Sequence, residues 1–183
     1  LGSEENAFFC EGVVENILTH LAGFEGLRVI SYTSAAKYRN TGKDIRTIAS
    51  ELGVAYVLEG SVRQHDNQLR ITAQLIRAKD DRHLWAKSYD RELRNVMEIQ
   101  SEVAQEIAAA LNQEISPEIK KRMEKSPTPH VEAYQYFLRG RHLMRTRTRE
   151  GLEESLRQFD LALEQDPRFS EAYAGKAPAF NPL

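Results

Sequence analysis

Few residues in this chain have the types and spacing that chemistry requires. Asp80, Asp81 and His83 could supply three metal ligands, but no second set of ligands stands at the spacing of a metal site. Aspartate is also a common turn residue, because its side chain readily bonds to the backbone of a turn. We therefore interpret these three residues as a turn between two strands.

The segment Thr41-Gly42-Lys43-Asp44 is superficially similar to a phosphate-binding loop. That motif needs a glycine where this chain has Lys37, and a serine or threonine where it has Asp44. We interpret the segment as a turn that ends in a helix cap. Because no catalytic, metal-binding or cofactor-binding set is evident, we expect the chain not to be an enzyme and to need no cofactor.

Three residues in the predicted strands could instead contact a ligand or serve the structure. Glu59 is a carboxylate in an apolar strand, which costs free energy unless it is paired or exposed, and Gly60 beside it predicts a bulge or a close backbone contact. Glu59 is either a ligand contact at the sheet edge or, as we favour, a partner in a structural hydrogen bond. Trp85 and Tyr89 alternate onto one face, either as core beneath a helix, which we favour, or as an aromatic patch for a partner.

The composition excludes several classes of protein. Hydrophobic residues are 41% of the 183 residues and charged residues are 28%, as in ordinary folded domains. The net charge of −2 creates no field that attracts nucleic acid or an anionic membrane. No apolar run approaches the ~18 residues of a membrane span. We therefore expect a protein or peptide partner, with no nucleic acid and no membrane contact by this segment.

The stretch 51–90 predicts three consecutive strands, and the rest of the chain is organised around it. Residues 69–75 alternate between apolar and polar side chains, which is typical of a strand with one buried face. The turn residues at 65–67 predict a hairpin, and a second polar turn at 79–82 leads into the last strand. An antiparallel meander is the simplest pairing.

Other elements flank these strands. Residues 27–32 (LRVISY) predict a further short strand. Residues 45–52 predict a helix, with Asp44 as its N-cap and Gly53 as its C-cap. The segment 95–112 predicts the longest amphipathic helix, which should cover the sheet.

Three prolines around the charged run EIKKRMEK indicate a domain boundary. We predict a domain over residues 1–115, a linker or short exposed helix over 116–129, and a helical segment over 130–183. The predicted fold class is a small α/β (α+β) domain, whose mixed sheet ends in an antiparallel meander, followed by an all-α segment.

The helical segment has the order helix, turn, helix and proline that is typical of a tetratricopeptide repeat. The residues that match the second half of this motif are Ser155, Phe159, Ala162 and Pro167. Tyr173 and Ala177 match the opening of a second repeat, so the segment would hold about one and a half repeats.

As a whole, the chain resembles the N-terminal-type domain of TolB followed by tetratricopeptide repeats. The segments that carry the resemblance are Phe9-Cys10-Glu11-Gly12, 27–30, 44–53, 56–62, 69–75, 83–91 and Ala172-Tyr173-Ala174-Gly175. The resemblance implies a protein-binding or sensory module without catalysis. Such modules form C-terminal parts of bacterial regulators, behind a class III adenylate cyclase domain or a CadC-like winged-helix domain, often after a membrane helix. The family begins with an apolar strand that is missing here, because the chain starts at Leu1.

The resemblance also implies where a partner would bind. The contacts would lie on the first helix of the repeat, at Tyr134, Phe137, Arg141, Met144 and Arg145. The arginines of the run 139–149 could bind a phosphate or an acidic peptide, but a solvated helix face is the interpretation we favour.

Two functions follow as hypotheses. The first is a non-enzymatic protein-interaction or sensory module of a larger bacterial regulator, which binds its partner through the sheet edge or the repeat groove. The alternative is a regulatory fragment of a nucleotide cyclase, or of another enzyme whose catalytic domain lies upstream. A homodimer is a further expectation, because a missing strand would expose the sheet edge and because Tyr173 and Phe180 lack a following helix to cover them.

Overall fold

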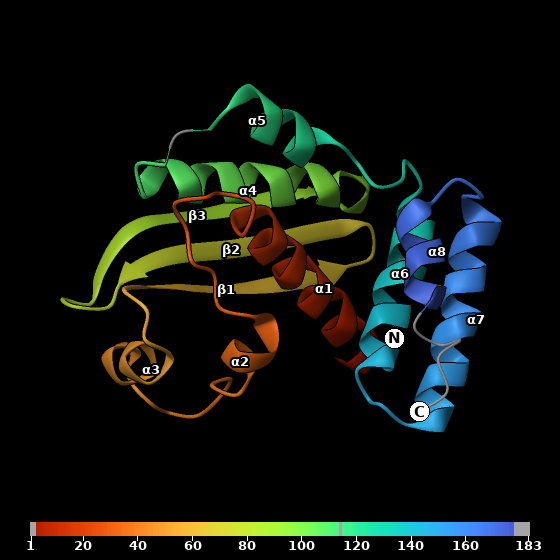
Figure 1. Cartoon of the computed structure of the whole chain (residues 1–183), viewed down its shortest axis with the longest axis horizontal. Coiled ribbons are helices and arrows are strands. Elements are labelled where there is room, and N and C mark those ends of the chain that lie inside the picture. Colours follow the sequence, from red (N-terminus) through yellow and green to blue (C-terminus); the bar gives the residue numbers. More distant parts are fainter. Residues whose placement is uncertain (1–2, 114, 178–183) are drawn as a thin grey trace. The chain divides into compact units, whose positions relative to one another are not determined.

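The computed structural model describes residues 3–113 and 115–177 of the chain. Phe180 and Leu1 lie outside the described residues. The helices and strands are α1 (Ser3–Leu21), α2 (Tyr32–Ala36), α3 (Ile45–Leu52), β1 (Tyr56–His65), β2 (Gln68–Arg77), β3 (Arg82–Glu92), the 3-10 turn η1 (Leu93–Asn95), α4 (Val96–Ala110), α5 (Pro117–Glu124), α6 (Val131–Met144), α7 (Arg149–Gln165) and α8 (Ser170–Lys176) (Figure 1). Within the described residues the fold is therefore a mixture of one sheet and eight α-helices.

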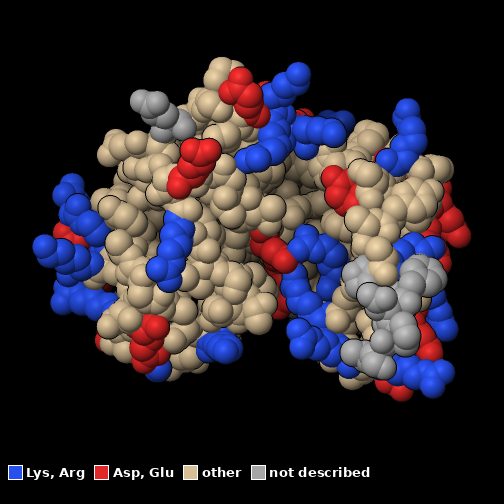
Figure 2. Space-filling model, in the orientation of Figure 1, with Lys and Arg blue, Asp and Glu red and all other residues tan. Residues whose placement is uncertain are grey.

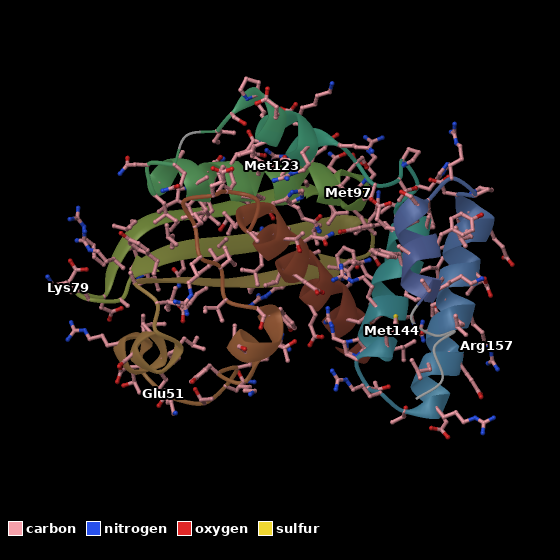
Figure 3. The ribbon with its side chains drawn as sticks, viewed as in Figure 1. Glu51, Lys79, Met97, Met123, Met144 and Arg157 are labelled. Atoms are coloured by element: carbon pink, nitrogen blue, oxygen red, sulfur yellow. The ribbon has the colours of Figure 1, made fainter. Side chains whose placement is uncertain are left out.

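The chain divides into two compact units, which are described one at a time. The first, here called the sheet unit, is Val13–Glu124. The second, here called the helical unit, consists of Leu1–Gly12 and Lys125–Leu183. The predicted linker 116–129 contains helix α5, which belongs to the sheet unit and buries Met123 (Figure 3).

The sheet has the strand order β1-β2-β3, and both pairs are antiparallel. The predicted meander is confirmed. Gly60 is opposite Ala73 and Ala73 is opposite Lys87, while a register shift follows Leu75. The prediction of a mixed sheet is wrong for the described residues, because every pair of strands in them runs antiparallel.

Residues 27–31 do not form the predicted strand. They run as an irregular segment into α2, where the Ser31 side chain caps the helix by accepting a hydrogen bond from the Ser34 N–H (3.3 Å). A strand forms only where a neighbouring strand supplies ladder partners for its backbone. Between described residues, the backbone hydrogen bonds of this segment are all local: Leu27 N–H donates to Phe24 C=O, and the Ser31 C=O accepts from the N–H groups of Ser34 and Ala35.

One face of the sheet is the core of the sheet unit. Strand β2 buries Leu69, Ile71, Ala73 and Leu75 on this face, in the predicted alternation. Helix α4 packs on β2 and β3, and the predicted apolar stripe of this helix is buried at Val96, Ile99, Val103 and Ile107. Helix α1 contributes Val13, Ile17 and Leu21 to the buried set. The alternation of period two and the stripe of period 3.6 thus meet in one core.

Helix α3 has the two caps that the sequence predicts. Asp44 accepts a hydrogen bond from the Thr47 N–H (2.8 Å) at the N-terminus. Gly53 ends the helix with φ of 63°, a left-handed conformation that glycine adopts at little cost. Both caps satisfy backbone groups that a helix end leaves without partners.

The helical unit is built from α6, α7 and α8, which lie side by side in Figure 1. Aromatic rings pack together in its core, where the Phe137 centroid lies 6.0 Å from that of Phe159 and 5.0 Å from that of Phe169. A Cβ atom on Gly140 would lie 2.7 Å from the Phe159 ring, and one on Gly175 would lie 2.8 Å from it. The two glycines therefore let α6 and α8 approach α7 closely.

A buried carboxylate joins the start of the helical unit to the α7–α8 turn. The Thr128 hydroxyl donates to Asp166 Oδ2 (2.7 Å), and the Arg168 backbone N–H donates to Asp166 Oδ1 (2.9 Å). These hydrogen bonds, that from Thr128 first, hold the pKa of Asp166 below its ordinary value of 3.8. A carboxylate whose pKa is lowered by folding stabilises the fold above the unfolded pKa, and this stabilisation is lost as the pH falls through the folded pKa.

We expect Asp166→Asn to make the free energy of unfolding of the helical unit depend less on pH in the acid range. The variant should be less stable than the natural chain at neutral pH, and this difference should shrink as the pH falls below 3.8. Urea unfolding at a series of pH values measures this difference. Asp66→Asn, on the exposed β1–β2 turn, is the matched control. Equal differences between Asp166→Asn and the natural chain at neutral and acid pH would contradict the assignment.

Candidate functional site

Strand β1 is one of the two edge strands of the sheet, and the side of β1 that faces away from β2 is here called the free edge. The hydrogen bond from Ala78 N–H to Ala55 C=O (3.0 Å) extends the β1–β2 ladder by one pair. Because hydrogen-bonded pairs alternate in an antiparallel ladder, the odd-numbered residues of β1 bond to β2, and the even-numbered ones direct their backbone groups to the free edge. Between described residues, no backbone hydrogen bond joins β1 to a segment other than β2 and the β2 extension.

Gly60 lies near the middle of this edge and is exposed. A glycine has only backbone atoms, so its exposure is exposure of the strand backbone itself. A Cβ atom at position 60 would lie 2.5 Å from the Thr72 carbonyl oxygen on β2, which is closer than a real side chain can come. The close backbone contact predicted at Gly60 is therefore present, while the register shift lies elsewhere, after Leu75.

Glu59, next to Gly60, is half-buried on the opposite face of the sheet from the core. Its Oε2 accepts a hydrogen bond from Gln74 Nε2 (2.9 Å) on β2. This is a bond to the neighbouring strand, as the structural interpretation expected. The hydrogen bond also fixes the orientation of the Glu59 carboxylate on β1, the strand that has the free edge.

A row of charged residues crosses the same face of the sheet. Arg63 on β1 is directly opposite Arg70 on β2, and Arg70 is directly opposite Asp90 on β3. Arg70 Nε donates to Asp90 Oδ1 (2.6 Å), and this carboxylate raises the pKa of Arg70. Arg63 has no ion pair within the described part of the chain. At the free edge the row therefore ends with two like charges, those of Arg63 and Arg70, side by side.

A half-buried polar network lies on the core face, where β3 meets α4. Trp85 Nε1 donates to Glu106 (2.9 Å), and Lys87 Nζ bonds to Glu106 (2.5 Å) and to Glu102 (3.1 Å). The Lys87 ammonium also lies 4.7 Å from the centre of the Tyr89 ring. The sequence analysis singled out Trp85 and Tyr89, and the structure brings them onto one face beside these charges.

The charges of the network support one another. The bonds to Glu106 and then Glu102 raise the pKa of Lys87. Burial first, and then the negative charge of Glu106, raise the pKa of Tyr89. Burial acts against ionisation of Glu106 as well, but the hydrogen bonds from Lys87 and Trp85 outweigh it and lower the pKa of this carboxyl. The network thus stabilises the charged forms of Lys87 and Glu106, and it joins α4 to β3.

Trp85 and Tyr89 differ in burial. Trp85 is half-buried, and its indole nitrogen reaches Glu106 at the edge of the core. Tyr89 is 1% exposed, and its hydroxyl is buried near Glu106 without a hydrogen bond of normal geometry. Tyr89 is therefore a core residue, whereas Trp85 bridges core and surface.

The five residues predicted to bind a partner through α6 separate into two groups. Tyr134 is 0% exposed and Phe137 is 8% exposed, so both rings belong to the core of the helical unit and offer almost no surface to a partner. Arg141 lies with its guanidinium 5.6 Å from the centre of the Phe137 ring, and burial lowers its pKa. Met144, at the end of α6 (Figure 3), is half-buried, and Arg145 is exposed.

The basic run on α6 is partly neutralised within the helical unit. His142 Nδ1 lies 3.0 Å from Glu11 Oε2 on α1, and the Arg139 guanidinium lies 5.8 Å from the centre of the Phe8 ring. Although Arg145 as a whole is exposed, partial desolvation of its guanidinium lowers its pKa, and the negative charge of Glu11 opposes this shift. On the face that Figure 2 shows, basic and acidic side chains are interspersed, as a net charge of −2 allows.

Three further features bear on the chemistry of the chain. A cavity of about 790 Å³ in the sheet unit lies between the end of α1 and the start of α5, and its lining includes Phe24, Gln113 and Ile119. Within residues 3–113 and 115–177, no three His, Cys, Asp or Glu side chains gather as metal ligands. In the same residues, no helix has the length and apolar character that crossing a membrane requires.

Comparison with known proteins identifies the sheet unit. Residues 3–108 match the model of a family described as "HilA/YgeH-like transcriptional regulator, second domain". The match covers more than half of the chain. The chain belongs to this family.

A relative of this HilA/YgeH-like chain is the Rhizobium meliloti (strain 1021) protein named "Putative adenylate cyclase 3". The two are 37% identical over 173 residues, which is 94% of this chain. The chain spans only 30% of the length of that relative.

These findings correct the family resemblance. The HilA/YgeH-like match replaces the predicted TolB-like domain, and neither comparison identifies tetratricopeptide repeats in residues 130–183. The motif positions misled for a physical reason. Phe159 and Gly175 are the residue types that any closely packed helices need where a ring meets a backbone, so they indicate helix packing and not one repeat family.

Sequence reasoning missed the row formed by Arg63, Arg70 and Asp90. A signal was present, because a hairpin centred on the predicted turn at 65–67 places residues 63 and 70 opposite each other. The Lys87–Glu106 pair carried no such signal, since it joins a strand to a helix whose rotation only packing determines.

Proposed function

We propose that this HilA/YgeH-like domain is a non-catalytic, protein-binding part of a larger transcriptional regulator, and that it binds its partner through the free edge of β1. The exposed backbone of Gly60 is the observation that carries this proposal. An open edge presents a row of N–H and C=O groups, and proteins use such rows to add a strand from a partner.

The comparisons support a regulatory role for this segment that is separate from the activity of the whole protein, whether that is control of transcription or cyclase catalysis. The matching family is named for transcriptional regulators, whereas the relative is named as an adenylate cyclase. A segment shared by proteins with such different outputs is best explained as the part that receives a signal or a partner. The segment covers only 30% of the relative, which leaves ample chain there for a separate output domain.

The sheet edge is a better binding surface than the helices of the helical unit. The aromatic anchors once expected on α6, Tyr134 and Phe137, are used up in the core. By contrast, the middle of β1 exposes its backbone, and Tyr56 at the start of this strand is 43% exposed. Strand addition needs these features and no cofactor.

A second candidate function is a regulatory segment of a nucleotide cyclase. The 37% identity to the cyclase relative over 94% of this chain favours it. In this case too, the chain itself would bind a protein and the catalytic residues would lie in another part of the protein. The two candidates share the surface and differ only in the output that it controls.

The test places a photo-crosslinking phenylalanine analogue at one of two exposed tyrosines. Tyr56 stands on the proposed edge, and Tyr173, which is 56% exposed on α8, is the matched control. In cells that express the full chain, we expect protein adducts from position 56 and none from position 173. Mass spectrometry of the adducts names the partner.

An edge-blocking variant makes this test specific. Gln64→Pro removes an N–H that points to the free edge, whereas Arg63→Pro removes one that bonds to β2. Gln64→Pro should abolish the adducts while the chain stays folded, as judged by circular dichroism. Arg63→Pro should be less stable than Gln64→Pro by about 1 kcal/mol, because it loses a ladder bond. Adducts at position 56 that survive in folded Gln64→Pro would reject the edge as the binding surface.

A further inference from the structure

We propose that Arg63 and Arg70 form a binding site for a phosphate monoester. The site lies on the face of the sheet opposite the core, here called the open face. It uses side chains of β1 and β2 and no backbone group of the free edge. The inference therefore goes beyond the proposed function and does not depend on it.

The two arginines stand side by side on neighbouring strands. Arg63 is directly opposite Arg70 in the β1–β2 ladder, and both residues are exposed. The odd-numbered residues of β1 exchange backbone hydrogen bonds with β2, and the Cα atoms of such a pair are about 5.5 Å apart. At this separation two long arginine side chains can place both guanidinium groups on one ligand that lies on the open face.

The positive charge of Arg63 is not neutralised within the sheet. Like charges in directly opposite positions are unfavourable, and of the two arginines it is Arg70 that has a carboxylate, through the bond from its Nε to Asp90 Oδ1 (2.6 Å). Arg63 has no ion pair within residues 3–113 and 115–177. Glu59, on the same face of β1, is four residues away, about 13 Å along the strand, and it accepts a hydrogen bond from Gln74. An anion from outside the chain can supply what Arg63 lacks.

The donors of the two arginines favour a phosphate over a carboxylate. Each guanidinium presents five N–H groups in a planar fork. A carboxylate has two oxygens in one plane, which one fork can satisfy. A phosphate monoester has three strong acceptor oxygens in a tetrahedral arrangement and a charge of about −1.5 to −2 at neutral pH. Two forks that approach from neighbouring strands therefore match the larger anion.

Two neutral donors flank the arginine pair. Ser61 precedes Arg63 by two residues and Gln68 precedes Arg70 by two, so all four side chains lie on the open face. Because β1 and β2 are antiparallel, Ser61 and Gln68 stand on opposite sides of the pair along the strands. Both are exposed, and a hydroxyl and an amide can each donate to a phosphate oxygen.

The experiment titrates the full chain with phenyl phosphate at constant ionic strength and follows the Nε–Hε signals of its arginines by NMR. We expect the signals of Arg63 and Arg70 to shift along one saturating curve, with a Kd on the order of 1 mM. Arg63→Gln and Arg70→Gln should each weaken binding roughly 10-fold or more. Arg91→Gln removes the same charge from the other face of β3 and should leave the Kd unchanged. Benzoate, which has a carboxylate on the same ring, should bind roughly 10-fold more weakly than phenyl phosphate.

Asp90→Asn tests whether the anion and Asp90 compete for Arg70. The substitution frees Arg70 from its internal carboxylate, so phenyl phosphate should bind roughly 3- to 10-fold more tightly. Glu92→Gln is the matched control, because it removes the same charge from the same face of β3, where Glu92 pairs with Arg94 (2.9 Å). It should change the Kd by less than about 2-fold, since an exposed charge acts weakly at a distance. Circular dichroism of each variant confirms that it is folded.

A peptide of six residues that contains phosphoserine identifies the source of the phosphate. Binding that is at least about 10-fold tighter than that of phenyl phosphate assigns the site to a phosphorylated partner chain. Equal binding of the two probes assigns it to a small phosphate ester. Either result supports the site.

Three outcomes overturn the proposal. The first is the absence of a saturable shift of the Arg63 and Arg70 signals up to about 10 mM phenyl phosphate. The second is a Kd that folded Arg63→Gln leaves unchanged, or that benzoate equals. The third is an equal gain from Asp90→Asn and Glu92→Gln, which would show that overall charge and not Arg70 decides binding.

Discussion

Replacing Phe159 by alanine is expected to lower the stability of the helical unit by about 3–5 kcal/mol, the usual cost of removing a buried phenylalanine ring. The ring is 0% exposed and lies against Phe137, Gly140 and Gly175, so its loss opens a cavity between all three helices of the unit. Hydrogen exchange in α6 and α7, followed with increasing urea, measures the effect on this unit.

Tyr173→Ala is the matched control, because Tyr173 is an aromatic residue of the same unit that is 56% exposed. It should change the stability by no more than about 0.5 kcal/mol. Equal effects of the two substitutions would show that the Phe159 ring is not the centre of this core.

The glycines at Phe159 allow a second check. Gly140→Ala places a methyl group 2.7 Å from the ring, and such overpacking costs about 1–3 kcal/mol. The cost should be smaller when Phe159 is also replaced by leucine, because the smaller side chain leaves room for the new methyl group. Strict additivity of the two changes would count against the close approach.

Replacing Tyr89 by alanine is the second large effect that we expect, again about 3–5 kcal/mol. The Tyr89 ring is 1% exposed, stands opposite Ile71 on the core face of the sheet, and underlies the Lys87 ammonium at 4.7 Å. Removing it would also weaken the support of the ion pairs between Lys87 and α4. Trp85 emission is a direct measurement of unfolding of the sheet unit, since its indole nitrogen bonds to Glu106 on α4.

Tyr89→Phe tests which part of the side chain matters. The hydroxyl is buried without a hydrogen bond of normal geometry, so its removal should change the stability by less than about 0.5 kcal/mol or raise it. A loss of more than about 1 kcal/mol in Tyr89→Phe would instead show that the hydroxyl bonds to Glu106.

Patterns with a short range in sequence predicted much of the sheet unit. The three strands and their turns follow from the alternation at 69–75 and from turn residues, and Asp44 and Gly53 cap α3 as expected. These features could be predicted because each depends on residues within one turn or one hairpin. The burial of α4 was predictable as well, since the stripe through Ile99 and Val103 has only one apolar side to bury.

Features that need a distant partner were not predictable in the same way. Residues 27–31 have the composition of a strand, yet they find no neighbouring strand and remain irregular. On α6, the family resemblance places Tyr134 and Phe137 on a partner-binding surface, but α7 and α8 pack over that side of the helix and bury both rings. Helical spacing identifies a face of a helix and does not say which neighbour covers it.

The candidate binding edge shows the same division. The sequence by itself determined that β1 is a strand, that Glu59 and Arg63 share one face of it, and that Gly60 stands between them, because strand periodicity is a local property. Only the tertiary structure decided that β1 is an edge, that Arg70 faces Arg63, and that Asp90 pairs with Arg70. Strand order and cross-strand charge contacts join residues far apart in the chain, and they are set by which surfaces pack together.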